Sequence, residues 1–216
     1  VNQGNADGVT PLYISCQNGH LDVVQLLIYE GVADVHQAQD FGATPLLISC
    51  QQGHLDVAQF LLSDAVGADV HQAENQGGTP LYMACHNGHL DVVRFLLSQD
   101  VAADAHQATN NGATPLWVAC SHGRLDIARF LLSGAVAADV HRANNNGATP
   151  LYMSCRKGQL DVVRFLLSED IAADVRQAKH SGATPLYISC HGGHLDIVRF
   201  LVSAEGGADV HQPGHV

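Results

Sequence analysis

The sequence predicts an all-α solenoid of six stacked repeats, each with the form helix–turn–helix–loop. Six cysteines follow one another at spacings of 34 or 35 residues, and a Thr-Pro-Leu triplet and a glycine recur in step with them. A period of this length is typical of supersecondary units that stack on their neighbours. We expect a single array over 1–216, with repeats at 2–35, 36–70, 71–105, 106–140, 141–175 and 176–210, and the start of a further repeat at 211–216.

The first helix of each repeat should begin at the Thr-Pro pair. Threonine is a favourable N-cap, and proline is tolerated at the first helical position because its missing N–H would be unpaired there. The glycine three residues after each cysteine suits the left-handed position that ends a helix. A Leu-Asp pair then opens the second helix, and in the third repeat Val92, Val93 and Leu96 form its apolar face. The Ala-Asp-Val-His-Gln-Ala segment that follows predicts an extended loop or hairpin.

Equal spacing indicates that each cysteine is the same site in successive repeats. Stacked helices lie about 8–10 Å apart, whereas a disulfide needs Cα atoms within about 7 Å. We therefore expect all six cysteines to be reduced, buried packing residues. Reduced thiols place the chain in an intracellular, reducing compartment, cytoplasmic or nuclear.

Composition excludes several function classes. Hydrophobic residues make up 46% of the chain, but no run is long enough for a membrane span. The net charge of −11 repels phosphate backbones, so neither nucleic acid nor a membrane is expected as a partner. No catalytic motif is present, so we expect no enzyme and no cofactor. Histidines one repeat apart are too distant to share a metal ion, so we predict no metal site.

The repeats resemble the ankyrin repeat over essentially the whole chain. The second repeat carries Thr44-Pro45-Leu46, then Gly53-His54-Leu55-Asp56-Val57, and ends with Gly67-Ala68-Asp69-Val70. The resemblance implies a curved solenoid in which the first helices and finger-like loops line a concave groove. The histidine that usually follows Thr-Pro-Leu is replaced here by Tyr13, Leu47, Tyr82, Trp117, Tyr152 and Tyr187.

The candidate binding residues are those that differ between repeats. The resemblance implies that the loop tips and the ends of the first helices face the groove. At the tips we select Asp40, Phe41, Asn75, Gln76, Asn110, Asn111, Asn145 and Asn146. At the helix ends we select Gln51, Gln52, His86, Asn87, Ser121, His122, Arg156 and Lys157. To these we add Tyr82, Trp117 and Tyr152, because aromatic side chains are favoured interface anchors. Their spacing would equally fit packing between repeats. Phe41, at a polar tip, is the best exposed anchor.

The predicted function is a non-catalytic scaffold that binds a protein partner through its groove and loops. Residues 1–93 hold ten acidic residues and no Lys or Arg, so the N-terminal half could attract a basic peptide or domain. The alternative is a structural array that associates end to end through its terminal repeats, because the last predicted helix is as apolar as the internal ones.

Overall fold

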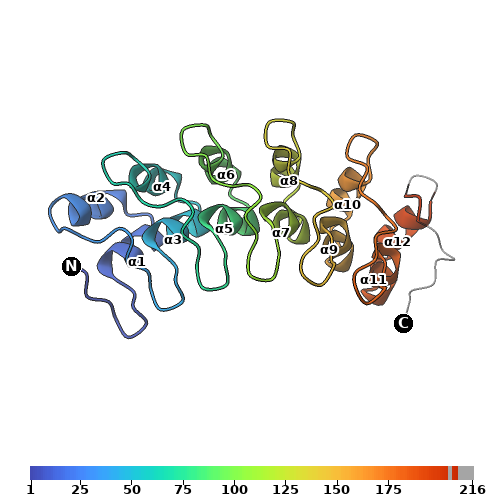
Figure 1. Cartoon of the computed structure of the whole chain (residues 1–216), viewed down its shortest axis with the longest axis horizontal. Helices are drawn as coiled ribbons and strands as arrows, with labels where there is room; N and C mark the ends of the chain where they lie inside the picture. Colours follow the sequence, from blue (N-terminus) through green and yellow to red (C-terminus); the bar gives the residue numbers. More distant parts are fainter. Residues whose placement is uncertain (204–205, 209–216) are drawn as a thin grey trace. The chain divides into compact units, whose positions relative to one another are not determined.

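The computed structural model describes residues 1–203 and 206–208. These residues form twelve α-helices and no strand, which confirms the predicted fold class (Figure 1). The chain divides into two compact units, Val1–Asn110 (unit 1) and Asn111–Val216 (unit 2). The further repeat predicted at 211–216 lies outside the described residues. The single array over 1–216 stays a prediction.

Each unit holds three helix pairs, one pair for each repeat. Unit 1 contains α1 (Pro11–Gln17), α2 (Leu21–Tyr29), α3 (Pro45–Gln52), α4 (Leu55–Leu61), α5 (Pro80–Asn87) and α6 (Leu90–Leu96). Unit 2 contains α7 (Pro115–Ser121), α8 (Leu125–Leu131), α9 (Pro150–Arg156), α10 (Leu160–Leu166), α11 (Pro185–His191) and α12 (Leu195–Val202). Within each unit the first helices pack on one another in sequence, and the second helices do the same.

The helix starts are those expected from the sequence. In all six repeats the threonine before the proline is the N-cap, and its hydroxyl accepts a hydrogen bond from the backbone N–H three residues on, as Thr44 does from Leu47 at 3.1 Å. Gly53 and Gly88 take the left-handed conformation directly after α3 and α5. Each repeat therefore fixes its first helix by local chemistry at both ends.

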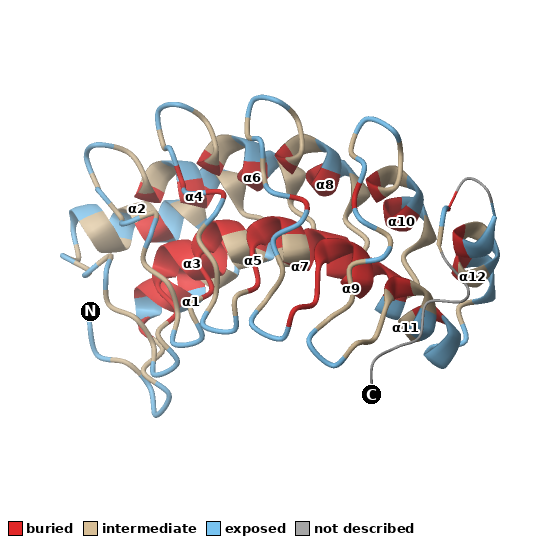
Figure 2. Cartoon of the chain, turned by 45° about the vertical axis from the view of Figure 1, so that its right-hand side comes forward, coloured by how far each residue is buried: buried red, intermediate tan, exposed pale blue. Residues whose placement is uncertain are grey.

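The core of each unit runs along the first helices and the inward sides of the second helices (Figure 2). Five cysteines are free thiols in this core, as predicted. Cys190 in α11 differs, because it is a free thiol that is exposed. Its equivalent in α9, Cys155, is fully buried because α11 packs on α9. Burial at this position therefore requires a following repeat.

The turn after each second helix contains a residue with left-handed backbone conformation. In the second repeat this residue is Gly67, with φ of 72°. The equivalent residues in other repeats are Val32, Ala102, Ala137 and Ala172, with φ between 51° and 53°. A side chain in this region of φ costs about 1–2 kcal/mol. The turn imposed by the stacked helices therefore overrides the local preference of these residues.

Replacing Val32 with glycine is expected to stabilise the protein by about 1 kcal/mol. Val32 is 79% exposed, so little packing is lost, and glycine removes the strain of a β-branched residue at φ of 53°. The readout is the midpoint of urea unfolding followed by far-UV circular dichroism. Gly67→Ala is the matched control and should destabilise, because a methyl group there meets open space and only the backbone cost remains. A lower midpoint for V32G would contradict the prediction.

Candidate protein-binding surface

The loop tips of unit 1 are joined by a chain of backbone hydrogen bonds. The N–H of Asp40 donates to the carbonyl of Asp7 (3.1 Å), and the N–H of Asn75 donates to the carbonyl of Phe41 (3.0 Å). The N–H of Asn110 donates in turn to the carbonyl of Gln76 (2.9 Å). Side-chain amides reinforce this chain, since Asn75 Nδ2 donates to the Asp40 carbonyl. The tips are therefore held by their neighbours, while their side chains lie at the surface.

Phe41 combines a fixed backbone with an exposed ring. Its N–H donates to Gln39 Oε1 at 2.6 Å, and its carbonyl accepts the hydrogen bond from Asn75. The residue is nevertheless 70% exposed. The ring is therefore accessible to a partner, and aromatic side chains are enriched at protein–protein interfaces. This observation fits the sequence-based interpretation of Phe41 as an anchor.

In unit 2, Asn145 and Asn146 lie at exposed loop tips. The N–H of Asn145 donates to the Asn111 carbonyl (2.9 Å), and the Asn146 carbonyl accepts from His180 (3.1 Å). These tips repeat the arrangement of unit 1 without an aromatic residue. They offer amide groups and no apolar anchor.

The selected helix-end residues differ in their exposure. Gln52, His122, Arg156 and Lys157 are exposed. Half-buried positions are occupied by Gln51, His86 and Asn87. Ser121 is only 3% exposed. We leave Ser121 out of the proposed surface because a partner could not reach its hydroxyl.

Within each unit, a ladder of residues connects a repeat to the one before it. His54 Nε2 lies 3.0 Å from the carbonyl of Gln17, and its ring fills the space where Gly19 has no side chain. His89 lies in the same way against the Gln51 carbonyl and Gly53. In unit 2, His194 Nε2 lies 3.0 Å from the Arg156 carbonyl. These histidines bond nearby backbone, as the sequence suggested, and the contacts they make join consecutive repeats.

Two of the three selected aromatic residues, Trp117 and Tyr152, pack between repeats. Tyr152 is 3% exposed and belongs to a buried cluster with Ala148 and Met153, against which Trp117 packs. The indole Nε1 of Trp117 donates to the Ala148 carbonyl at 2.8 Å. Tyr82 is half-buried, and burial raises the pKa of its phenol. Of the two interpretations left open by the sequence, packing describes Tyr152 and Trp117, so we leave both out of the proposed surface.

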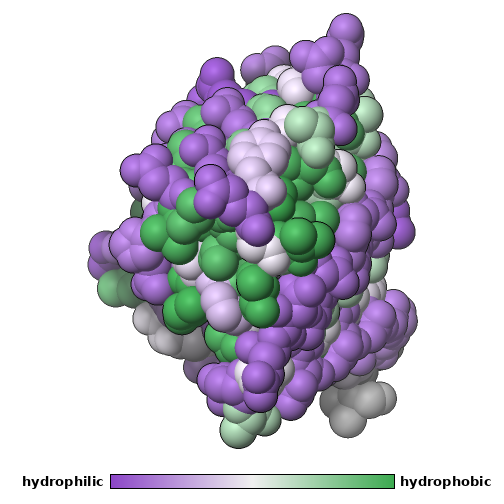
Figure 3. Space-filling model, turned by 90° about the vertical axis from the view of Figure 1, so that its left-hand side faces the viewer, coloured by the Kyte–Doolittle hydropathy of each residue, from purple (hydrophilic) through white to green (hydrophobic). Residues whose placement is uncertain are grey.

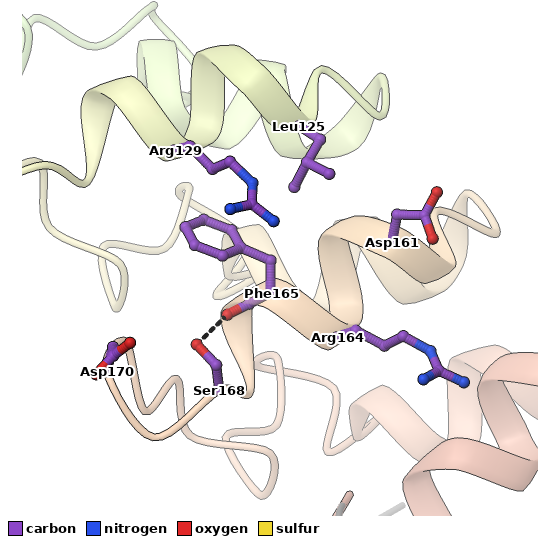
Figure 4. Close-up of a pocket in the computed structure, with 7 residues that line it drawn as sticks. All are labelled: Leu125, Arg129, Asp161, Arg164, Phe165, Ser168 and Asp170. Atoms are coloured by element: carbon purple, nitrogen blue, oxygen red, sulfur yellow. Dashed lines mark hydrogen bonds between the residues drawn. The ribbon is translucent and has the colours of Figure 1, made fainter.

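Sequence reasoning missed a cation–aromatic contact between consecutive second helices. The guanidinium of Arg129 in α8 lies 4.9 Å from the ring centre of Phe165 in α10 (Figure 4). Arg164 lies at the same distance from the ring of Phe200. The signal was present, because an Arg-Phe-Leu triplet recurs in each second helix from the third repeat on. A hollow of about 470 Å³ beside Arg129 is open to solvent and also contains Asp161. We assign this feature to packing between repeats.

The described residues show neither a metal-binding cluster nor a membrane-spanning helix. In this part of the chain no group of three or more His, Cys, Asp or Glu side chains is placed to hold a metal ion. No helix among the same residues has both the length and the apolar composition required to cross a bilayer. Every buried side-chain nitrogen or oxygen described has a hydrogen-bond partner.

Helix pairs that stack through a histidine ladder and aromatic contacts between repeats define an α-helical repeat protein with a preformed polar surface. A family model for ankyrin repeats (3 copies) matches residues 1–74, 65–144 and 135–213. The chain therefore belongs to the ankyrin repeat family, whose members generally act as protein–protein interaction modules and are typically non-enzymatic. A comparison with curated proteins finds no match.

Proposed function

We propose that this protein is a non-catalytic scaffold that binds a protein partner through its loop tips and first-helix ends. The observation that carries the proposal is Phe41, whose backbone is fixed at both its N–H and its carbonyl while the residue as a whole is 70% exposed. Because its backbone is already held in place, Phe41 loses little backbone entropy on binding. Aromatic side chains of this kind contribute most of the affinity in many interfaces.

The charge of unit 1 favours a basic partner. Unit 1 contains twelve acidic residues and one basic residue, Arg94, which gives a net charge of −11. Unit 2 contains nine acidic and nine basic residues. Asp40, the neighbour of Phe41, is exposed. We therefore propose a lysine- or arginine-rich peptide or domain that also carries an apolar group for the Phe41 ring. Association with it should slow as salt is added.

Replacing Phe41 with alanine is expected to weaken partner binding about 30-fold, the effect of losing a hot-spot residue of about 2 kcal/mol. Partners are captured from lysate on the immobilised protein, and those enriched by the wild-type chain are titrated against both forms. The fold should be unchanged, because the hydrogen bonds of residue 41 use its backbone.

Tyr29→Ala is the matched control for this experiment. Tyr29 is an aromatic residue of unit 1 that is 62% exposed, but it lies in α2 and not at a loop tip. Capture should be unaffected by this change. Partners that bind F41A as tightly as the wild-type protein would refute the role of the tips.

The free thiols support an intracellular site of action. Five of the six cysteines are buried and unpaired by disulfides. Chains that keep several reduced thiols are typical of reducing compartments. We therefore propose the cytoplasm or the nucleus as its location.

A second candidate function is end-to-end assembly through the first and sixth repeats. The observation that favours it is the exposure of apolar residues whose equivalents in other repeats are buried. Ile14 is 43% exposed, whereas its equivalent Ile48 is 3% exposed. Tyr187 is 56% exposed, whereas its equivalent Tyr152 is 3% exposed. Such an assembly would make the chain a structural array rather than an adaptor.

A further inference from the structure

Apolar side chains gather on the face that repeat 1 presents away from repeat 2 (Figure 3). We define this head face by Ile14, Val23 and Leu26, which are 43%, 43% and 54% exposed. Val57, the equivalent of Val23 in the second repeat, is fully buried. In repeat 2 the same face is covered by repeat 1, because α1 packs on α3 and α2 on α4. The fold itself thus shows what kind of surface covers a head face.

The opposite face of repeat 6 is apolar in the same way. We define this tail face by Tyr187, Cys190 and Val202, all of which are exposed. In the fifth repeat, the equivalents Tyr152 and Cys155 are buried where α11 packs on α9. Within unit 2, the tail face of repeat 5 covers the head face of repeat 6. Repeat 6 therefore presents the same kind of surface, but in an exposed form.

From this match we propose that the tail face of one molecule docks on the head face of a second copy, in the register that joins consecutive repeats within each unit. The proposal rests on the end-to-end candidate above, and it names the partner, the two surfaces and their alignment.

An aromatic side chain and a hollow form the first matching pair. In unit 2, Trp117 packs against Ala148 and Met153 of the next repeat. Tyr187 is the equivalent of Trp117 in repeat 6, and Val9 and Ile14 are the equivalents of Ala148 and Met153 in repeat 1. A hollow of about 550 Å³ lies beside Val9 and Ile14. The exposed Tyr187 ring of one copy can occupy this hollow in the next.

The histidine ladder provides the second matching pair. His54 and His89 each fill the space beside a glycine of the preceding repeat. His20 holds the equivalent position in repeat 1 and is exposed. Gly193 holds the glycine position in repeat 6, and a side chain placed there would meet no described atom within 4 Å. Docking places the ring of His20 beside Gly193 and continues the ladder from one molecule to the next.

Charge supports a joint between unlike ends. In unit 2, Arg129 and Arg164 each lie over a phenylalanine of the next repeat. Arg199 is the equivalent arginine in repeat 6 and is exposed. Its counterpart across the joint is Leu26, which lies one helical turn from Asp22 in α2 and from Glu30, the C-cap residue of that helix. At the joint, the guanidinium of Arg199 would therefore lie near the carboxylates of Asp22 and Glu30 and not over an aromatic ring.

The joint is tested with one variant that blocks each face. Val23→Glu places a charge on the head face, and Tyr187→Lys places one on the tail face. Wild-type protein should form larger species as its concentration rises in analytical ultracentrifugation, because each head-to-tail contact leaves one face of each kind unpaired. Either variant alone should associate about 100-fold more weakly, since each would bury an unpaired charge. An equimolar mixture should stop at a one-to-one dimer through the intact tail of one and the intact head of the other.

Two further measurements separate this register from other forms of assembly. Cys190 lies on the tail face, so its alkylation should slow as wild-type concentration rises, while V23E alone should show no such change. Phe41→Ala is the control and should assemble like the wild-type chain, because Phe41 belongs to neither face. Circular dichroism establishes that each variant is folded.

The possible outcomes have distinct meanings. A wild-type chain that stays monomeric at every concentration would refute both end-to-end assembly and the joint, and would assign the two faces to a different partner. Assembly that persists in both single variants would refute the joint alone, as would a mixture that forms no dimer. Loss of assembly in F41A would instead point to the loop tips.

Discussion

Raising the pH from 8 towards 10 is expected to destabilise the protein steeply. Burial raises the pKa of Cys16, Cys50 and Cys155 to about 12, and raises that of Cys120 as well. In the unfolded chain a thiol ionises near pH 8.5–9. Above that pH the unfolded state releases protons that the folded state retains. The stabilisation from each neutral thiol is therefore complete below about pH 8.5 and is lost progressively as pH rises towards the folded pKa.

The expected loss in the free energy of unfolding is about 1 to 1.5 kcal/mol per thiol for each pH unit above about pH 8.5. For the four thiols together the loss is about 5 kcal/mol per pH unit. A typical domain has a stability of about 5–15 kcal/mol, so one to two pH units could remove most of it. The readout is the urea midpoint at a series of pH values up to 10. Tyrosines in the unfolded chain ionise near pH 10, so they add to the loss only at the top of this range.

Two alanine substitutions give this prediction its control. Cys50→Ala removes one buried thiol, so the fall of stability with pH should become shallower by about a quarter. Cys190→Ala removes the exposed thiol and should leave the wild-type slope in place. A midpoint that does not change between pH 8 and 10, or equal slopes for wild type and C50A, would show that the buried thiols do not govern alkaline stability.

Replacing Leu96 with alanine is expected to cost about 2–5 kcal/mol. Leu96 in α6 is fully buried, and its equivalents Leu61, Leu131 and Leu166 are equally buried. Deletion of its side chain removes the transfer free energy of the lost carbons and leaves a cavity that the stacked helices fill only in part. Urea unfolding followed by circular dichroism measures the loss.

Leu26→Ala is the matched control, because Leu26 also lies in a second helix of unit 1 but is 54% exposed. It should cost less than about 1 kcal/mol when measured in dilute solution, where association of the ends does not contribute. Equal losses for L96A and L26A would mean that the buried stripe of the second helices is not the main source of stability.

Much of the fold could be predicted because its determinants are local. The Thr-Pro pair caps each first helix through a hydrogen bond that spans only three residues, as between Thr44 and Leu47. The regular spacing of the cysteines reported the repeat length directly. The candidate site was harder to predict, because Tyr152 and Tyr187 occupy the same position in their repeats and yet are 3% and 56% exposed. Only the presence or absence of a neighbouring repeat separates them.

The sequence by itself determined the repeat, its two helices, their caps and the reduced cysteines, since these depend on residue type and spacing within one repeat. The tertiary structure alone decided which side chains reach solvent. Phe41 has an exposed side chain because its N–H donates to Gln39 and its carbonyl accepts from Asn75, so both hydrogen bonds use only its backbone. Trp117 is held between repeats because the Ala148 carbonyl of the next repeat accepts its indole N–H. The contacts of Phe41 with Asn75 and of Trp117 with Ala148 join residues about one repeat apart, and no local pattern encodes them.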